Sequence, residues 1–357
     1  MKKLKPTTRS NIFTYGALLI IFTVVYILNN GGVISNNISG LLIPICAYVC
    51  MSISLNLTVG ILGELSLGHA GFMSVGAFSG VIAASALRNV TDNGTLQLIA
   101  AIAIGAVFAA IAGAIVGVPV LRLNGDYLAI VTLAFGEIIK NLLNNFYIGV
   151  DNSGLHFSMK DTASLNMDKG TVIVNGPMGA VGIPKVSTLI VGFILILICY
   201  AATANITNSR TGRAIKAIRD NRIAVESVGI SVAKYKLMTF VTSAAMAGMA
   251  GALYALNYTT ITPKKFDFNT SILILVFVVL GGIGNVRGGM IAATVLVVLP
   301  ELLRAVKDYR MLMYAVVLIL VMIFTNNRKA RGLIIDPAKK LFGKLIPKRG
   351  KGGDANG

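Results

Sequence analysis

Two carboxylates in apolar surroundings are the residues of this chain best placed to do chemistry. Glu64 lies in a glycine-rich break, LGELSLGHAG (62–71), and Glu137 lies within TLAFGEIIKNLLNN. Ionisable groups at membrane depth are costly, and by default they indicate a solute pathway or a proton or ion relay. Glu137 has an alternative explanation, because Lys140 is three residues further on and can pair with it on a helix. Glu64 has no such local partner, although it could also lie at a membrane surface.

The sequence contains no recognisable catalytic, metal-binding or phosphate-binding motif. His69 and His156 are the only histidines, and neither belongs to a Ser/His/Asp or metal-binding pattern. Cys46, Cys50 and Cys199 fall in apolar runs and are expected to be small buried side chains. The phosphate-binding pattern G-x-x-x-x-G-K-S/T does not occur, so the chain cannot cradle ATP phosphates by itself. We therefore expect a protein that is not an enzyme and that carries no cofactor or metal.

A charged segment, residues 206–236, separates two long apolar runs. Its two acidic residues, Asp220 and Glu226, are outnumbered by seven cations: Arg210, Arg213, Lys216, Arg219, Arg222, Lys234 and Lys236. Each Lys or Arg at the centre of a bilayer costs about 2.5–3.5 kcal/mol on insertion scales. The segment is therefore predicted to be a loop, and its positive charge indicates the cytoplasmic side.

The same segment has the pattern of a docking helix. Thr211-Gly212-Arg213 can open a short helix whose apolar side contains Ala214, Ile215, Ala217 and Ile218. The cations recur every third residue, so they are expected to spread around the helix rather than form one basic stripe. Such a helix suits a groove on a soluble partner. The alternative is a solvated loop that only sets topology.

The elements that position these residues are predicted to be membrane helices. The chain is 55% hydrophobic, 13% charged and has a net charge of +18. Its Lys and Arg concentrate at the N-terminus, in 206–236 and in the tail, which favours topology and anionic headgroups over nucleic acid. A spanning helix needs about 20 apolar residues, and ten segments qualify or nearly so: 11–28, 40–60, 70–88, 95–119, 127–146, 187–205, 237–257, 270–284, 289–304 and 310–325.

This pattern predicts an all-α polytopic membrane protein with about 8–10 spanning helices. With the N-terminus in the cytoplasm, ten crossings put 206–236 and the tail inside and the polar stretch 147–186 outside. We expect a transmembrane domain over 1–325 and a basic, disordered cytoplasmic tail over 326–357. The second glycine-rich break, GGIGNVRGG (281–289), mirrors the first in the opposite half of the chain. Such a pair can mark an inverted repeat around a substrate site.

Four motifs together resemble the permeases of branched-chain amino acid ABC importers. They are GELSLGHAGFMSVGAFSG, GDYLAIVTLAFGEIIKNLLNN (125–145), the segment 209–255 beginning SRTGRAIKAIRDNRIAVESVG, and GGIGNVRGGMIAATVL (281–296). They occur in order across most of residues 40–325. The G-D-Y-L-A-I-V-T-L motif and the long stretch 147–186 resemble the M-type subunit rather than its H-type partner. One departure is Glu64, where the family is expected to carry Gln; a carboxylate in the pathway would favour an ammonium group or a cationic solute.

The resemblance implies partners and sites. The chain would form a heterodimer with a related H-type permease in the plasma membrane, dock two cytoplasmic ABC ATPases and receive substrate from an extracytoplasmic binding protein. Expected pathway residues are Glu64, Ser66, Gly68, His69, Gly71, Phe72, Asp126, Tyr127, Thr132, Glu137, Gly282 and Gly284. Expected ATPase-coupling residues are Gly212, Arg213, Arg219, Arg222, Glu226 and Gly229.

Two other functions remain open from the sequence. The urea or short-amide importer permeases share these motifs, and competition of uptake by urea or by leucine would separate the two branches. An ion-coupled carrier that needs no ATPase would use Glu64 and Glu137 as its coupling carboxylates. That carrier would transport its solute as a single purified chain.

Overall fold

The computed structural model describes residues 6–32, 35–88, 91, 93–121, 126–151, 154–165, 167, 170–303, 315–316 and 319. The chain divides into two compact units, Met1–Val298 and Leu299–Gly357. Of the second unit the structure describes the last residues of one helix and four further positions. The expected tail, 326–357, and most of the predicted segment 310–325 lie outside the described residues.

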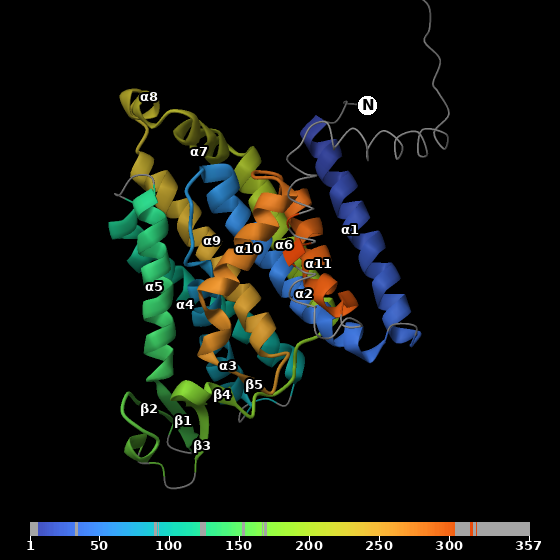
Figure 1. Cartoon of the computed structure of the whole chain (residues 1–357), viewed down its shortest axis with the longest axis vertical. Coiled ribbons are helices and arrows are strands. Elements are labelled where there is room, and N and C mark those ends of the chain that lie inside the picture. Colours follow the sequence, from blue (N-terminus) through green and yellow to red (C-terminus); the bar gives the residue numbers. More distant parts are fainter. Residues whose placement is uncertain are drawn as a thin grey trace, which may run out of the picture. The chain divides into compact units, whose positions relative to one another are not determined.

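The first unit is built from long apolar helices (Figure 1). Their bounds are α1 Pro6–Asn30, α2 Asn36–Leu55, α3 His69–Leu87, α4 Gly94–Val120, α5 Asp126–Asn144, α6 Leu189–Asn208, α7 Arg210–Asp220, α8 Arg222–Ser227, α9 Val232–Ala255, α10 Phe268–Gly281 and α11 Val286–Leu302. A π-helix, η1 (Asn56–Leu62), continues α2. Short 3-10 turns are η2 Ala163–Leu165, η3 Gly176–Met178 and η4 Pro263–Phe266.

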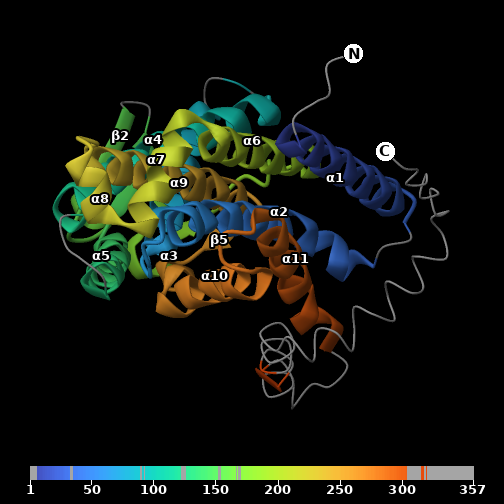
Figure 2. The same cartoon turned by 90° about the horizontal axis from the view of Figure 1, so that it is seen from above.

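Seven of the described helices are long and apolar enough to cross a membrane, and α10 is a shorter apolar helix. The seven coincide with the first seven segments predicted from the sequence, so the polytopic helical fold is confirmed. The eighth and ninth predicted segments correspond to α10 and α11. Figure 2 shows α2 between α6 and α10, and both of these helices pack on it.

Helices α3, α4 and α9 form the tightest packing in the first unit. They meet at Gly76, Gly105 and Gly248, one from each helix. A Cβ on Gly248 would lie 2.5 Å from the carbonyl oxygen of Gly105, and a Cβ on Gly105 would lie 2.8 Å from that of Gly76. Small residues are what allow helix backbones to approach this closely in a membrane. Glycines therefore bring these three helices together.

The stretch between α5 and α6 forms a small antiparallel sheet, which the sequence analysis did not predict. The sheet has the order β2-β1-β3-β4-β5, with β1 Tyr147–Asp151, β2 Gly154–Ser158, β3 Thr171–Asn175, β4 Ala180–Val181 and β5 Thr260–Ile261. Ile148 pairs with Phe157 on one side and Val174 on the other. The pairing of Ala180 with Ile261 joins this stretch to the connection between α9 and α10. Figure 1 shows the strands at the opposite end of the helices from α7 and α8.

The close glycine contact between α3, α4 and α9 predicts that a Gly→Ala change there lowers the stability of the protein, which is the opposite of its usual effect in a helix. In an open helix position such a change stabilises by about 0.5–1 kcal/mol. Gly248→Ala should instead destabilise, because overpacking costs about 1–3 kcal/mol. Gly16→Ala is the matched control, since nothing lies within 4 Å of its Cβ position. Thermal unfolding of the detergent-solubilised protein would measure both, and a Gly248→Ala variant as stable as Gly16→Ala would contradict the packing argument.

Candidate functional site

A broken helix creates the site. The π-helix η1 ends at Gly63, whose φ of +82° only glycine adopts easily. Residues 63–68 then leave helical structure before α3 begins at His69. Because His69 contacts Ser54, a residue of α2 that precedes η1, the chain must run back alongside the helix it has just left. Irregular backbone at membrane depth is tolerated only where protein or a water-filled cavity surrounds it.

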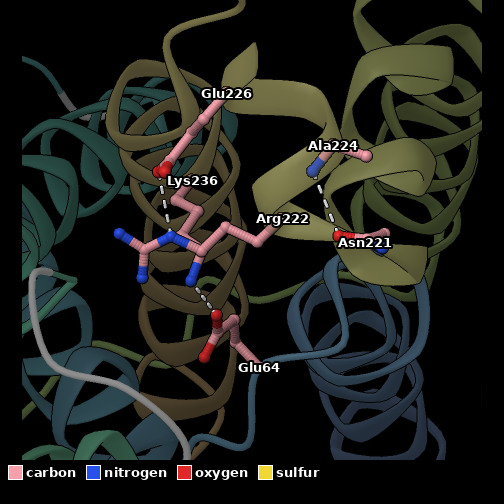
Figure 3. Close-up of polar contacts among 6 residues, drawn as sticks. All are labelled: Glu64, Asn221, Arg222, Ala224, Glu226 and Lys236. Atoms are coloured by element: carbon pink, nitrogen blue, oxygen red, sulfur yellow. Dashed lines mark hydrogen bonds and ion pairs between the residues drawn. The ribbon is translucent and has the colours of Figure 1, made fainter.

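The first residue of the break that carries a charge, Glu64, is neutralised by a distant partner. Its carboxylate forms an ion pair with Lys236 of α9, and the side chains are only 16% and 5% exposed, respectively. Figure 3 shows the Lys236 amine directed at Glu64. The sequence analysis found no partner because the two residues are 172 positions apart. It was also wrong in placing Lys236 in a loop, since α9 begins at Val232 and contains it.

Backbone groups in the remainder of the break bond to side chains of neighbouring helices. The N–H of Leu67 donates to the Thr132 hydroxyl of α5 over 3.1 Å. At the start of α3, the N–H of Ala70 donates to the Ser271 hydroxyl of α10, also over 3.1 Å. Such side chains replace the hydrogen bonds that a broken helix loses. The break is therefore held by α5 and α10 as well as by α9.

Three glycines bring α5 against the break. A Cβ on Gly68 would overlap the backbone of Thr132, and a Cβ on Gly71 would lie 2.9 Å from the Cα of Gly136. Phe72, one residue further, packs edge-to-face on Phe240 of α9 with the ring centroids 5.4 Å apart. Gly68, Gly71 and Phe72 therefore act in helix packing, whatever further role they have.

His69 belongs to a buried polar cluster between α2, α3 and α9. The hydroxyls of Ser54 and Ser243 each donate to the other's backbone carbonyl over 2.6 Å. Nε2 of His69 lies 2.7 Å from the Ser54 hydroxyl oxygen. With both hydroxyl protons on carbonyls, Nε2 is the donor and Nδ1 is left as an acceptor. Nδ1 is buried and has no partner among the described residues.

Unpartnered polar atoms concentrate near this break. Within the described chain, buried side-chain atoms that lack a hydrogen-bond partner are Ser52 Oγ, Asn56 Nδ2, Ser66 Oγ, His69 Nδ1 and Asn144 Oδ1. Four of these five fall between residues 52 and 69. Buried polar groups are normally hydrogen-bonded, and exceptions concentrate where a bound water, an ion or a function supplies the partner. The break is therefore the part of the described chain with the most unmet hydrogen-bonding capacity.

A small cavity lies beside the break. Its volume is about 10 Å³, which is room for about one water. Two carboxylate residues line it, Glu137 of α5 and Asp267 at the start of α10, together with Leu67, Gly71, Leu133, Gly136, Phe266, Phe268 and Ser271. Glu137 also pairs with Lys140, as the alternative explanation proposed. Asp267 caps α10 by accepting from the Thr270 N–H over 3.0 Å.

The second glycine-rich break meets the first. Gly282 and Gly284 have φ values of +91° and +84° in the turn between α10 and α11. The N–H of Gly284 donates to Asn56 Oδ1 of η1 over 3.1 Å. A Cβ on Gly60 would lie 2.6 Å from the same backbone nitrogen. Two breaks from opposite halves of the chain thus contact each other.

The charged segment folds into two short helices rather than a loop with one. α6 continues to Asn208, Ser209 caps α7 by accepting from the Gly212 N–H, and Asn221 caps α8 at Ala224 (Figure 3). Gly212 packs directly on the last carbonyls of α6, because a Cβ there would overlap them. Its role is therefore to bring α7 against α6.

One face of α7 and α8 is buried and the other carries charge. Ile218 of α7 and Val225 of α8 pack with Val232 of α9 in one apolar cluster. Arg210, Arg213, Lys216 and Arg219 are all exposed, so the cations are more segregated than their spacing predicted. Arg222 and Glu226 form an exposed i,i+4 pair of 3.0 Å (Figure 3).

A Schellman turn ends α8. The N–H of Gly229 donates to the Glu226 carbonyl over 3.0 Å and the N–H of Ile230 donates to that of Val225 over 3.3 Å. This pattern requires a left-handed residue, and Gly229 has a φ of +80°. The glycine is exposed with open space around its Cβ position, so only its backbone conformation demands glycine.

The predicted pathway residues do not all converge. Glu64, Ser66, Gly68, His69, Gly71, Phe72 and Thr132 lie at the first break, Glu137 lies at the cavity beside it, and Gly282 and Gly284 lie in the second break. Tyr127 is 69% exposed at the other end of α5, and the side chain of Asp126 is outside the described residues. The sequence analysis missed Lys236, Ser243, Asp267 and Ser271. Of these four residues only Asp267 could have been recognised from the sequence, because an Asp directly before an apolar run is a typical helix N-cap.

These helices and the protected break define a polytopic membrane protein of the permease class. The profile of the family described as "Branched-chain amino acid transport system / permease component" matches residues 37–325. The chain therefore belongs to this family of transport permease subunits. No solved structure matches the chain significantly.

Curated relatives include both types of permease. The high-affinity branched-chain amino acid transport system permease protein LivM of Escherichia coli K12 is 36% identical over 287 residues, and LivM of Salmonella typhimurium LT2 is 35% identical. The matched region covers 78% of this chain and 66% of each LivM protein. LivH of Escherichia coli K12 is 27% identical over 285 residues, which cover 77% of this chain and 88% of LivH.

The buried ion pair predicts a large cost when one partner is removed. Lys236→Met leaves the Glu64 carboxylate buried and unpaired, which should destabilise the protein by about 3–5 kcal/mol. Adding Glu64→Gln should restore much of this stability, because no buried charge then remains. Lys140→Met is the matched control: its pair with Glu137 is more exposed and is worth at most about 1 kcal/mol. Thermal unfolding would measure all three, and equal costs for Lys236→Met and Lys140→Met would contradict the assignment.

Proposed function

We propose that this chain is a permease subunit of an ATP-driven importer for leucine, isoleucine, valine or related hydrophobic amino acids. The observation that carries the proposal is the family match over residues 37–325, with curated LivM and LivH permeases among the relatives. The chain itself hydrolyses no ATP in this proposal. It forms the translocation pathway with a second, LivH-like permease, and two separate ATPases and an extracytoplasmic binding protein complete the importer.

The proposed orientation puts α7 and α8 in the cytoplasm and the β-sheet outside. The exposed cations of α7 support it, since Lys and Arg are retained on the cytoplasmic side. Both termini are then cytoplasmic, and residues 326–357 form a basic cytoplasmic tail. The helices lie in the plasma membrane, with anionic lipid headgroups beside the basic segments.

The proposed pathway passes the first break. Its support is the group of unpartnered polar atoms at residues 52–69 and the adjoining cavity with two carboxylate residues and apolar walls. Asp267 suits an ammonium group, whereas Leu133 and Phe268 suit a branched alkyl side chain. The cavity holds about one water, so passage of an amino acid requires the helices around it to separate.

The pairing of both candidate carboxylates favours the importer over an ion-coupled carrier. Glu64 binds Lys236 and Glu137 binds Lys140, so each carboxylate already has a cationic partner. A carrier would need at least one of them to exchange that partner for a proton or Na⁺. Glu64 in particular does not offer a free negative charge to a cationic solute.

Reconstitution tests the function. The chain would be co-expressed with the neighbouring second permease, ATPases and binding protein, and uptake of labelled leucine into proteoliposomes measured while each component is omitted in turn. We expect uptake that requires ATP and every component, and that excess isoleucine but not urea abolishes.

Other outcomes would identify the alternatives. Uptake by this chain alone, driven by a proton or Na⁺ gradient, would reject the importer in favour of a carrier. ATPase stimulation by urea without leucine uptake would retain the ATP-driven importer and reject the amino acid substrate.

The apolar side chains of α8 and its C-terminal turn predict where the ATPase docks. Ile223 and Val228 are 79% and 76% exposed next to the charged face of α7. Val228→Asp should place a charge in the docking interface and lower the ATPase that co-purifies with the permease by about tenfold or more. Leu155→Asp on β2, where the leucine is 55% exposed, is the matched control and should leave ATPase binding unchanged. Equal ATPase binding by the two variants would exclude this docking surface.

A further inference from the structure

One cation of α7 is directed into the protein. Nη1 of Arg219 donates to the backbone carbonyl of Gly60 in η1 over 2.6 Å. The last carbonyls of any helix have no partner within that helix and form the negative end of its dipole. Gly60 is two residues from the end of η1, so Arg219 supplies the cation that this helix end lacks.

Glycines on both sides of Arg219 make this contact possible. The stem of Arg219 lies against Gly63, where a Cβ would be 2.8 Å from Cγ. Its guanidinium lies near Gly284 of the second break, where a Cβ would be 3.8 Å from Nη1. A side chain at Gly63 would displace Arg219, and one at Gly60 would collide with Gly284. Arg219 thus occupies the place where α7 and the two breaks come together.

Glu64, the charged residue of the break, is connected both to η1 and to α9. Glu64 follows Gly63 directly, and its N–H donates to the Thr58 carbonyl within η1 over 3.2 Å. Its carboxylate is paired with Lys236 on α9, and α9 also packs against α7 through Val232 and Ile218. Any displacement of α7 therefore acts on η1 through Arg219 and on the Glu64 pair through α9. π-Helices are rare, and those that interrupt an α-helix are often found at functional sites.

We propose that Arg219 is a transmission residue rather than an ATPase contact: it ties α7 to η1, so that α7 cannot move without moving the first break. The inference rests on the proposed function, because the force on α7 comes from the ATPases. It separates Arg219 from Arg213 and Lys216, cations of the same helix whose side chains make no hydrogen bond or ion pair to the transmembrane helices among the described residues.

The test uses the assembled importer in proteoliposomes with Arg219→Ala, Arg219→Lys and the matched control Lys216→Ala. Three quantities are measured: ATPase subunits retained per permease, ATP hydrolysis, and leucine taken up per ATP. For Arg219→Ala we expect normal ATPase retention and a fall in uptake per ATP of about tenfold, within the usual range of coupling between sites. Arg219→Lys should recover part of the loss, and Lys216→Ala should keep normal uptake per ATP.

A second measurement reports on the accessibility of the first break. Ser66→Cys, in a chain whose Cys46, Cys50 and Cys199 are replaced by alanine, is labelled with a maleimide with and without trapped ATP. ATP should change the labelling rate in the parent and in Lys216→Ala but not in Arg219→Ala. If Arg219→Ala does not fold, Gly63→Ala replaces it, because its Cβ would push the Arg219 stem away from η1.

Each outcome decides a separate question. Loss of ATPase subunits in Arg219→Ala in proportion to the loss of uptake would make Arg219 a docking residue and overturn the inference. Unchanged uptake per ATP, or an ATP-dependent labelling change that survives Arg219→Ala, would overturn it as well. If the parent complex shows no ATP-driven uptake, the proposed function fails and the inference falls with it.

Discussion

The constraint on which this structure depends is the protection of six non-helical residues among membrane helices. Backbone groups in lipid have no water to bond, so residues 63–68 persist only because neighbouring helices satisfy them. Thr132 and Ser271 accept the N–H groups of Leu67 and Ala70, and Lys236 neutralises Glu64. Four helices, α3, α5, α9 and α10, meet here, and two of them, α3 and α5, carry seven of the twelve expected pathway residues.

The same requirement explains why the core is so rich in small residues. The break occupies space that a continuous helix would fill, and α5 comes close to it through glycine contacts at Gly68, Gly71 and Gly136. On the other side, α3, α4 and α9 lock together through glycines whose backbones touch. A closely packed group of three helices thus faces a break with unmet hydrogen-bonding groups. This combination suits a transporter, in which one part must hold its shape while another rearranges.

Local patterns predicted the membrane helices and helical structure in the charged segment, but they could not predict contacts between residues far apart in the sequence. Apolar runs of spanning length located seven membrane helices, because a bilayer imposes length and composition on any spanning helix. The pairing of Glu137 with Lys140 was foreseen because it is local. The partner of Glu64 was not, since Lys236 lies 172 residues away and resembles its basic neighbours in sequence. The β-sheet escaped prediction because its strands are of two to five residues, too short for a clear alternating pattern.

The measurement that tests this account most directly is the structure of the assembled importer in two states, nucleotide-free and trapped with ATP. The two structures would be superposed on α3, α4 and α9, and the positions of α7 and η1 compared. The account predicts that α7 and η1 shift together, with the hydrogen bond from Arg219 to Gly60 intact and the surroundings of Glu64 changed. A shift of α7 that breaks this bond and leaves η1 in place would contradict it.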